Sequence, residues 1–225
     1  MFDTERMTAR IWNELGREYG VQNLSSLMPE TMGANHERIR GIFRRRVGRE
    51  FPFETFLRRT RERADEIVAR EGIPVKPGLF ELLDFLKKGG YTIAAASSTE
   101  RTRVLRYFRI AGVIGYFQAV ICGDMVRKSK PDPDIYLAAA KATGTAPEEC
   151  MALEDSPNGC LSASRAGMKA VMVPDLVRPD KKLHSILSAC VPTLRDVIPL
   201  LSGEAATGPR PAEAVPEGNG KEAGS

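Results

Sequence analysis

The sequence predicts an α/β protein in which a helical domain precedes a Rossmann-like parallel sheet. Three observations lead to this prediction. Apolar residues recur at spacings of three and four through residues 4–70, as they do on helices that bury one face. From residue 75 onward, short apolar runs alternate with amphipathic segments, as strands and helices do in a doubly wound sheet. Polar residues follow these apolar runs, and in such sheets the carboxyl ends of the strands form the ligand site.

The helical part is expected to be a bundle of about four helices. Met7, Ile11, Trp12 and Leu15 give the first of them its apolar face. Gly and Pro residues predict breaks near residues 20, 33, 48–52 and 72.

The α/β part follows in strict alternation. The predicted helices are GLFELLDFLKKGG, TERTRVLRYFRIAG, PDPDIYLAAAKATG and NGCLSASRAG. The predicted strands are YTIAAASS, FQAVICGD, CMALEDS and KAVMVPD. Their apolar character on both faces is typical of buried parallel strands. Residues 202–225 contain almost no large apolar side chain and are expected to form a disordered tail.

The composition is that of a globular protein. With 225 residues and 42% hydrophobic content, the chain can bury a substantial core. It has no run of about eighteen apolar residues that would span a bilayer. It also opens without a charged-then-apolar leader. We therefore expect a cytoplasmic protein with no membrane partner.

The four cysteines form neither a CxxC pair nor a metal-ligand spacing. They are Cys122, Cys150, Cys160 and Cys190. Because their neighbours are apolar, buried free thiols are expected rather than disulfides or a zinc site.

Arginines are concentrated in residues 38–63, a pattern that also occurs in nucleic-acid binding proteins. Acidic residues are interleaved with them, and no aromatic stacking pattern accompanies them. A solvated helix face is therefore the preferred interpretation, and no nucleic-acid partner is expected.

Three predicted strand ends carry residues suited to phosphate chemistry. Ser97 and Ser98 follow the first strand, and their hydroxyl and backbone N–H groups suit a phosphate. Lys130, after the second strand, adds a positive charge for the same anion. Glu154 and Asp155 end the third strand and suit a hard cation such as Mg²⁺. Together they indicate magnesium-assisted phosphoryl transfer.

Each of these groups also has a purely structural interpretation. The serines could simply end a strand, and a single lysine is most often a surface residue. Asp155 or Ser156 could cap the helix that begins near Pro157. The order of the groups along successive strand ends favours the site.

These motifs resemble those of the haloacid dehalogenase (HAD) superfamily, and within it the β-phosphoglucomutase-like phosphatases with a helical C1-type cap. The resemblance covers residues 1–201, with AAASST, KSKPDPDIYLAAA and LEDSPNG as its second, third and fourth motifs. It implies that Ser97 holds the phosphoryl group, with Ser98 beside it. Lys130 would steady the nucleophile and the phosphate. Asp155 would be a direct Mg²⁺ ligand, and Glu154 a direct or water-mediated one.

The first motif of the family departs from this pattern. It reads Asp-x-Asp-Gly followed by a short apolar stretch and Asp-(Ser/Thr)-Glu, and MFDTE resembles only its end. Asp3 and Thr4 then correspond to the hinge, where one of them would cap the first helix. The nucleophilic and acid/base aspartates, and the central strand that carries them, would lie before Met1. The chain as printed is therefore expected to be catalytically incomplete. Two explanations remain open: a start site further upstream, or a truncated and inactive relative.

The resemblance also divides the chain into domains. Residues 1–4 would be the remnant of the first motif and the hinge, and residues 5–74 the helical cap. Residues 75–201 would form the α/β core, and residues 202–225 the tail.

The cap suggests the substrate class. MGANHERIR resembles the cap segment that places an arginine on a second phosphate in the mutase, and the matching position is His36, after Asn35. Glu100 stands where a cation would favour a second anion. We therefore expect a monomeric phosphatase of small phosphorylated metabolites, with sugar phosphates as the expected substrates and Arg38 as an alternative source of positive charge. A sugar phosphomutase and a pseudoenzyme that binds phosphate or a partner remain alternatives.

Overall fold

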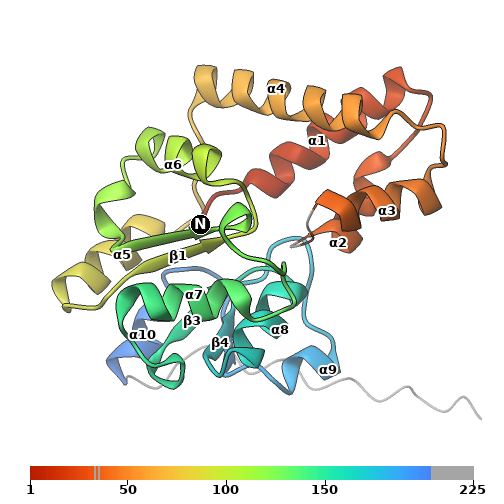
Figure 1. Cartoon of the computed structure of the whole chain (residues 1–225). Helices are drawn as coiled ribbons and strands as arrows, with labels where there is room; N and C mark the ends of the chain where they lie inside the picture. The colour runs from red at the N-terminus through yellow and green to blue at the C-terminus, as the bar shows by residue number, and fades with distance from the viewer. Residues whose placement is uncertain (33, 35, 204–225) are drawn as a thin grey trace, which may run out of the picture.

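The computed structural model describes residues 1–32, 34 and 36–203. The helices are α1 (Thr4–Glu18), α2 (Met28–Thr31), α3 (His36–Arg46), α4 (Phe53–Glu71), α5 (Leu79–Lys88), α6 (Arg101–Ile110), α7 (Asp134–Thr143), α8 (Pro157–Arg165), α9 (Lys181–His184) and α10 (Val197–Ser202). The strands are β1 (Ala94–Ser97), β2 (Ala119–Cys122), β3 (Met151–Glu154), β4 (Lys169–Met172) and β5 (Ala189–Cys190). Helices α1 to α4 form one part of the molecule, and the remaining elements form the other (Figure 1).

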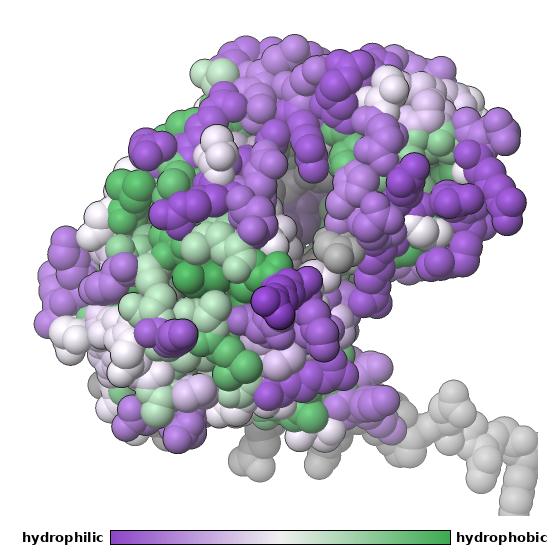
Figure 2. Space-filling view, in the orientation of Figure 1, coloured by the Kyte–Doolittle hydropathy of each residue, from purple (hydrophilic) through white to green (hydrophobic). Residues whose placement is uncertain are grey.

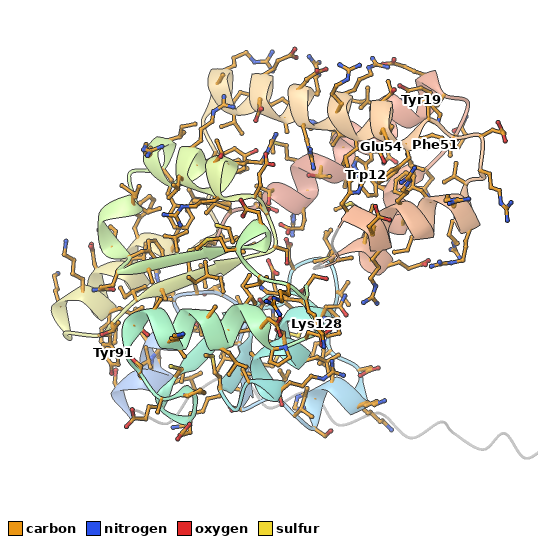
Figure 3. All side chains as sticks on the ribbon, viewed as in Figure 1. Trp12, Tyr19, Phe51, Glu54, Tyr91 and Lys128 are labelled. Atoms are coloured by element: carbon orange, nitrogen blue, oxygen red, sulfur yellow. The ribbon has the colours of Figure 1, made fainter. Side chains whose placement is uncertain are left out.

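Aromatic side chains hold helices α1 to α4 together, and these helices are called the cap below. Trp12 of α1 packs edge-on against Phe43 of α3 and Phe56 of α4, with ring centroids 5.1 and 5.7 Å apart. Phe43 and Phe56 are fully buried. In Figure 3, Trp12 and Phe51 both lie among the cap helices. The predicted apolar face of the first helix is confirmed, because Met7, Ile11, Trp12 and Leu15 are all buried.

The strands of the α/β part form two parallel sheets. β1 pairs with β2, and β4 lies between β3 and β5. All four predicted strands are present, and only the two-residue β5 was not predicted. In the part of the chain that the structure describes, β1 and β3 do not pair with each other.

Helices cover both faces of these sheets. On one face, α5, α6 and α10 bury Leu82, Phe108 and Val197 against strand residues such as Val171. On the other face, the buried residues come largely from α7 and α8, with alanines such as Ala139 and Ala163 packed on the strands. Small residues there let the helices approach the strands closely. The last described helix includes Ser202, which the sequence pattern assigns to the tail, and residues 204–225 lie outside the described part.

The cysteines are free, but they are not all buried. Cys122 and Cys160 are buried, Cys150 is half-buried, and Cys190 is exposed on β5. The prediction of buried thiols is therefore wrong for Cys190. Its strand was not predicted, and β5 lies at the edge of its sheet, where a side chain can face solvent.

The segment before α1 pairs with the linker between α4 and α5: the Asp3 N–H donates to the Pro74 carbonyl, and the Lys76 N–H donates to the Met1 carbonyl, both at 2.9 Å. The sequence predicts that Asp3 or Thr4 caps the first helix, and the structure confirms the position of Asp3 but not a capping hydrogen bond. Asp3 occupies the N-cap position, but its side chain makes no capping hydrogen bond. One Asp3 carboxylate oxygen lies 3.5 Å from Arg6 instead.

Further contacts tie the two parts together. Asp65 of α4 accepts hydrogen bonds from Arg103 and lies 3.1 Å from Arg106, both on α6. Asn158 at the start of α8 donates to the Met32 carbonyl of the cap at 2.9 Å. Figure 2 shows the surface hollowed between the two parts, with hydrophilic side chains along its margins.

The arginine-rich helices carry ion pairs within the cap. Arg58 pairs with Glu62 at 2.7 Å, and Arg63 pairs with Glu66 at 2.9 Å. These short-range pairs between exposed residues are typical of a solvated helix face. Among the described residues, no helix is both long enough and apolar enough to cross a membrane.

Candidate active site

The ends of β1 and β2 bring backbone and hydroxyl groups together. Ser97 ends β1, and its hydroxyl oxygen accepts a hydrogen bond from the Thr99 N–H at 3.2 Å. A Cβ atom at Gly123 would overlap the Ser98 carbonyl, so only glycine allows the two loops to lie this close. The residues after both strands therefore share one rim of the α/β domain, as predicted.

Lys130 is buried rather than a surface residue. It lies between β2 and α7, and it is only 5% exposed. Its ammonium group donates to the Ala96 carbonyl of β1 at 3.2 Å and to Glu154 of β3. It also lies 5.0 Å from the centre of the Tyr136 ring, a favourable position for a cation. Lys130 thus links the two sheets at the place where β1 and β3 do not pair.

Glu154 is held by three side chains. One carboxylate oxygen accepts from both Lys130 and the Tyr136 hydroxyl, and the other accepts from Ser156 at 3.2 Å. Burial and the Glu154 charge raise the pKa of Tyr136 well above its usual value, so this hydroxyl stays protonated and donates. The carboxylate lies directly against Gly159, where any Cβ atom would overlap it.

Ser156 is the N-cap residue of helix α8. Its hydroxyl oxygen accepts from the Gly159 N–H at 3.0 Å. The sequence left Asp155 and Ser156 open as the N-cap residue of α8. The structure shows that it is Ser156, so the Asp155 carboxylate is available for other contacts.

Asp155 forms an ion pair that the sequence did not predict. One of its oxygens lies 3.1 Å from the Lys76 ammonium, and the same ammonium lies 3.0 Å from Asp175. Burial opposes the charge of Lys76, but Asp155 and Asp175 outweigh it, and the pKa of Lys76 is raised. Asp175 also pairs with Arg6 at 3.3 Å.

Glu5 adds a further acidic group near this rim. Burial raises the pKa of Glu5, and the nearby Asp155 charge raises it further. The first turn of α1 therefore lies within electrostatic reach of the candidate metal ligand.

Two of the predicted cap residues, His36 and Arg38, lie on α3. His36 begins α3, and its Nε2 atom lies 3.0 Å from Glu54, which Figure 3 labels in the cap. Arg38 is exposed on the same helix. Asn35 lies outside the described residues. The structure thus places His36 in a contact within the cap, and its predicted contact with substrate stays a prediction.

The donor set fits a hard divalent cation such as Mg²⁺. Carboxylate oxygens of Asp155 and Asp175 converge on one point, where the Lys76 ammonium now lies. Oxygen ligands of this kind are those that Mg²⁺ prefers. Within the described residues, no group of three or more acidic, histidine or cysteine side chains is placed to hold a metal ion, so these two acids would supply only part of a ligand set.

Sequence reasoning missed Lys76, Tyr136 and the role of Asp175. Asp175 ends the fourth predicted strand, so its place on the rim could have indicated it. Tyr136 lies within the third motif, six residues after Lys130 by their numbers. Lys76 lies in a linker, and no periodicity or motif in the sequence signals its contact.

Comparisons with known proteins agree with this geometry. The family described as haloacid dehalogenase-like hydrolase matches residues 1–173. The protein YhcW of Bacillus subtilis (strain 168) is 33% identical over 178 residues, 79% of this chain and 80% of its own length. A phosphorylated carbohydrates phosphatase of Thermotoga maritima is 28% identical over 76% of this chain and 79% of its own.

A solved structure shows the same fold. A CbbY variant from Rhodobacter sphaeroides, in complex with xylulose-(1,5)bisphosphate, matches with a TM-score of 0.72 and 27% identity. The match covers 87% of this chain and 91% of that one. The chain described here belongs to the haloacid dehalogenase-like hydrolases.

Proposed function

We propose that this protein is a Mg²⁺-dependent phosphohydrolase of small phosphorylated metabolites, with sugar phosphates as its substrate class. The observation that carries the proposal is the contact of Lys130 with both the Ala96 carbonyl of β1 and the Glu154 carboxylate of β3, because Ser97 ends the first of these strands and Asp155 directly follows the second. The named activity of the Thermotoga relative and the sugar bisphosphate bound to CbbY support the substrate class.

Ser97 and Lys130 would bind the phosphoryl group. The Ser97 oxygen already accepts the Thr99 N–H, which leaves its own hydroxyl proton to donate to a phosphate oxygen. An ammonium group has three N–H donors. Those of Lys130 reach Ala96 and Glu154, and one donor remains for the phosphate or the nucleophile. Ser98 would add its hydroxyl or backbone N–H beside them.

Asp155 would be the direct Mg²⁺ ligand. When bound, the metal would neutralise charge on the transferring phosphoryl group. Glu154 would contribute through a water or by orienting Lys130, since its own oxygens already accept three hydrogen bonds. This refines the two roles that the sequence left open for Glu154.

The nucleophile is proposed to be an aspartate that precedes Met1 in the native polypeptide. Phosphoryl transfer through an aspartyl-phosphate needs an uncommitted carboxylate at the rim. Of the described carboxylates there, Glu154 is held by Lys130 and Asp155 by Lys76. Asp3 has one unpaired carboxylate oxygen, but it lies at the start of α1 rather than after a strand of the sheet and is no substitute. An upstream strand between β1 and β3 would bring the missing carboxylates to the rim.

The cap favours a phosphatase over a bisphosphate-dependent mutase. His36 contacts Glu54 at 3.0 Å, and an imidazole holds a second phosphate less firmly than the arginine fork of the mutase would. Arg38 could serve a substrate that carries one phosphate. If turnover instead requires a bisphosphate primer, the mutase alternative is supported.

The experiment is phosphate release from a panel of sugar phosphates by a polypeptide extended before Met1 to include the proposed nucleophile. We expect Mg²⁺-dependent release that EDTA abolishes and that Asp155→Ala or Lys130→Ala reduces at least about a hundredfold. Lys141→Ala, on the exposed side of α7, serves as the control and should leave the rate unchanged.

Two outcomes would contradict parts of the proposal. Measurable turnover by residues 1–225 alone would refute the need for an upstream carboxylate. Phosphate binding without any turnover by the longer polypeptide would favour the pseudoenzyme. Action as a monomer in the cytoplasm stays a prediction from the sequence.

A further inference from the structure

One half-buried lysine lies between the two acids best placed to bind a metal. The Lys76 ammonium is 3.1 Å from Asp155 and 3.0 Å from Asp175. The side chains of Lys76 and Asp175 are only 11% and 6% exposed, whereas that of Asp155 is 26% exposed. Solvent therefore screens these contacts less than it screens surface ion pairs.

The backbone fixes the position of this lysine. Its N–H donates to the Met1 carbonyl at 2.9 Å, and its carbonyl accepts from the Leu79 N–H at 3.3 Å. Lys76 thus lies on the linker between the cap and α5 rather than on a mobile surface loop. Arg6, whose side chain is 66% exposed, is the other cation paired with Asp175, at 3.3 Å.

Two carboxylates that share one ammonium cannot both bind a divalent cation at the same point until the ammonium moves away. Without Lys76, the two acids would repel each other and attract any cation more strongly. The pair is therefore a cation site that already contains a covalently attached cation.

We propose that Lys76 is a tethered cation that competes with Mg²⁺ for Asp155 and Asp175 and so sets the metal affinity of this site. The inference rests on the proposed function only in taking Asp155 as a metal ligand. It adds Asp175 as a second acid that faces the same position, and it predicts that Lys76 lowers the metal affinity of the resting site.

The test measures binding of Mn²⁺, as a probe for Mg²⁺, to the 225-residue chain without substrate. Free Mn²⁺ is followed by electron paramagnetic resonance. Lys76→Met is expected to lower Kd about tenfold or more. Lys141→Met removes an equal charge from the exposed side of α7 and is expected to leave Kd within about twofold of the unmodified chain. Adding Asp175→Asn to Lys76→Met should reverse most of the gain.

Equal Kd values for Lys76→Met and Lys141→Met would overturn the proposal. So would the absence of Mn²⁺ binding by both proteins at millimolar concentration.

A second measurement does not depend on the folding of Lys76→Met. In the unmodified chain with ¹⁵N-labelled lysines, the side-chain resonance of Lys76, assigned with Lys76→Arg, should shift when Mg²⁺ is added. The Lys141 resonance should not shift. An unchanged Lys76 resonance at saturating Mg²⁺ would overturn the proposal.

The two hypotheses fail separately in these experiments. A protein that binds Mn²⁺ as expected but never releases phosphate would contradict the proposed function alone. An active enzyme whose metal affinity does not respond to Lys76→Met would contradict this inference alone.

Discussion

Replacing Lys130 by methionine should destabilise the protein through the charge that it leaves behind. Lys130 is 5% exposed and Glu154 is 8% exposed, and the two form a buried ion pair between the sheets. Methionine has a similar length but no charge, so the packing changes little and the Glu154 carboxylate loses its cation.

The expected cost follows from the contacts that remain. Removing one partner of a buried ion pair costs about 3–5 kcal/mol. Glu154 would keep the hydroxyl donors Tyr136 and Ser156, and hydrogen bonds to a charged group contribute about 1.5–3 kcal/mol each. We therefore expect the lower end, a loss of about 3 kcal/mol in the free energy of unfolding.

Urea unfolding, followed by circular dichroism at neutral pH, measures this loss. Lys128→Met is the matched control, because Lys128 is 69% exposed on the same loop and should change stability by less than about 0.5 kcal/mol. In Figure 3, Lys128 lies on the α/β domain near the cap. Adding Glu154→Gln to Lys130→Met removes the unpaired buried charge of Glu154, and the free energy of unfolding should rise again by about 1 kcal/mol or more. A loss below about 1 kcal/mol for Lys130→Met, or no recovery in the double variant, would refute the reasoning.

Three further predictions concern other parts of the molecule. Phe56→Ala should lower the free energy of unfolding by about 3–5 kcal/mol, because Phe56 is fully buried among aromatic rings. Replacement of the exposed Phe80 by alanine should lower it far less. Urea unfolding measures both, and equal losses would contradict this account of the packing. At mildly alkaline pH, Cys190 should react with a thiol reagent before Cys160 does, because Cys190 is exposed whereas burial raises the pKa of Cys160 to about 12. Mass spectrometry of the labelled peptides identifies the cysteine that reacts first. Early labelling of Cys160 would contradict the prediction. Burial raises the pKa of Glu5, so its ionised form is less favourable in the folded than in the unfolded protein. Glu5→Gln should therefore stabilise the protein at neutral pH, and this gain should vanish as the pH falls below the unfolded pKa; a gain independent of pH in urea unfolding would rule this out.

The fold was predictable because its signals are local. Apolar spacing marked the face of α1, and short apolar runs marked β1 to β4. The two-residue β5 was missed because so short a strand has no period to detect. The exposure of Cys190 was missed for the same reason.

The candidate site was predictable only in part. The strand ends indicated Ser97, Lys130 and Asp155, since parallel strands bring their carboxyl ends to one rim. The contact between Lys76 and Asp155 joins residues far apart in the chain, and only the folded linker creates it. The burial of Lys130 likewise depends on α7 and β3 packing around it.

The central claim of the proposed function is that phosphoryl transfer at this rim passes through an aspartyl-phosphate, on a carboxylate other than those held by Lys130 and Lys76. The most direct measurement traps the native polypeptide with a radiolabelled sugar phosphate and Mg²⁺, then maps the labelled peptide. The account predicts a hydroxylamine-sensitive acyl-phosphate on an aspartate that precedes the printed sequence. A label on any residue of the printed sequence, or no acyl-phosphate during active turnover, would contradict it.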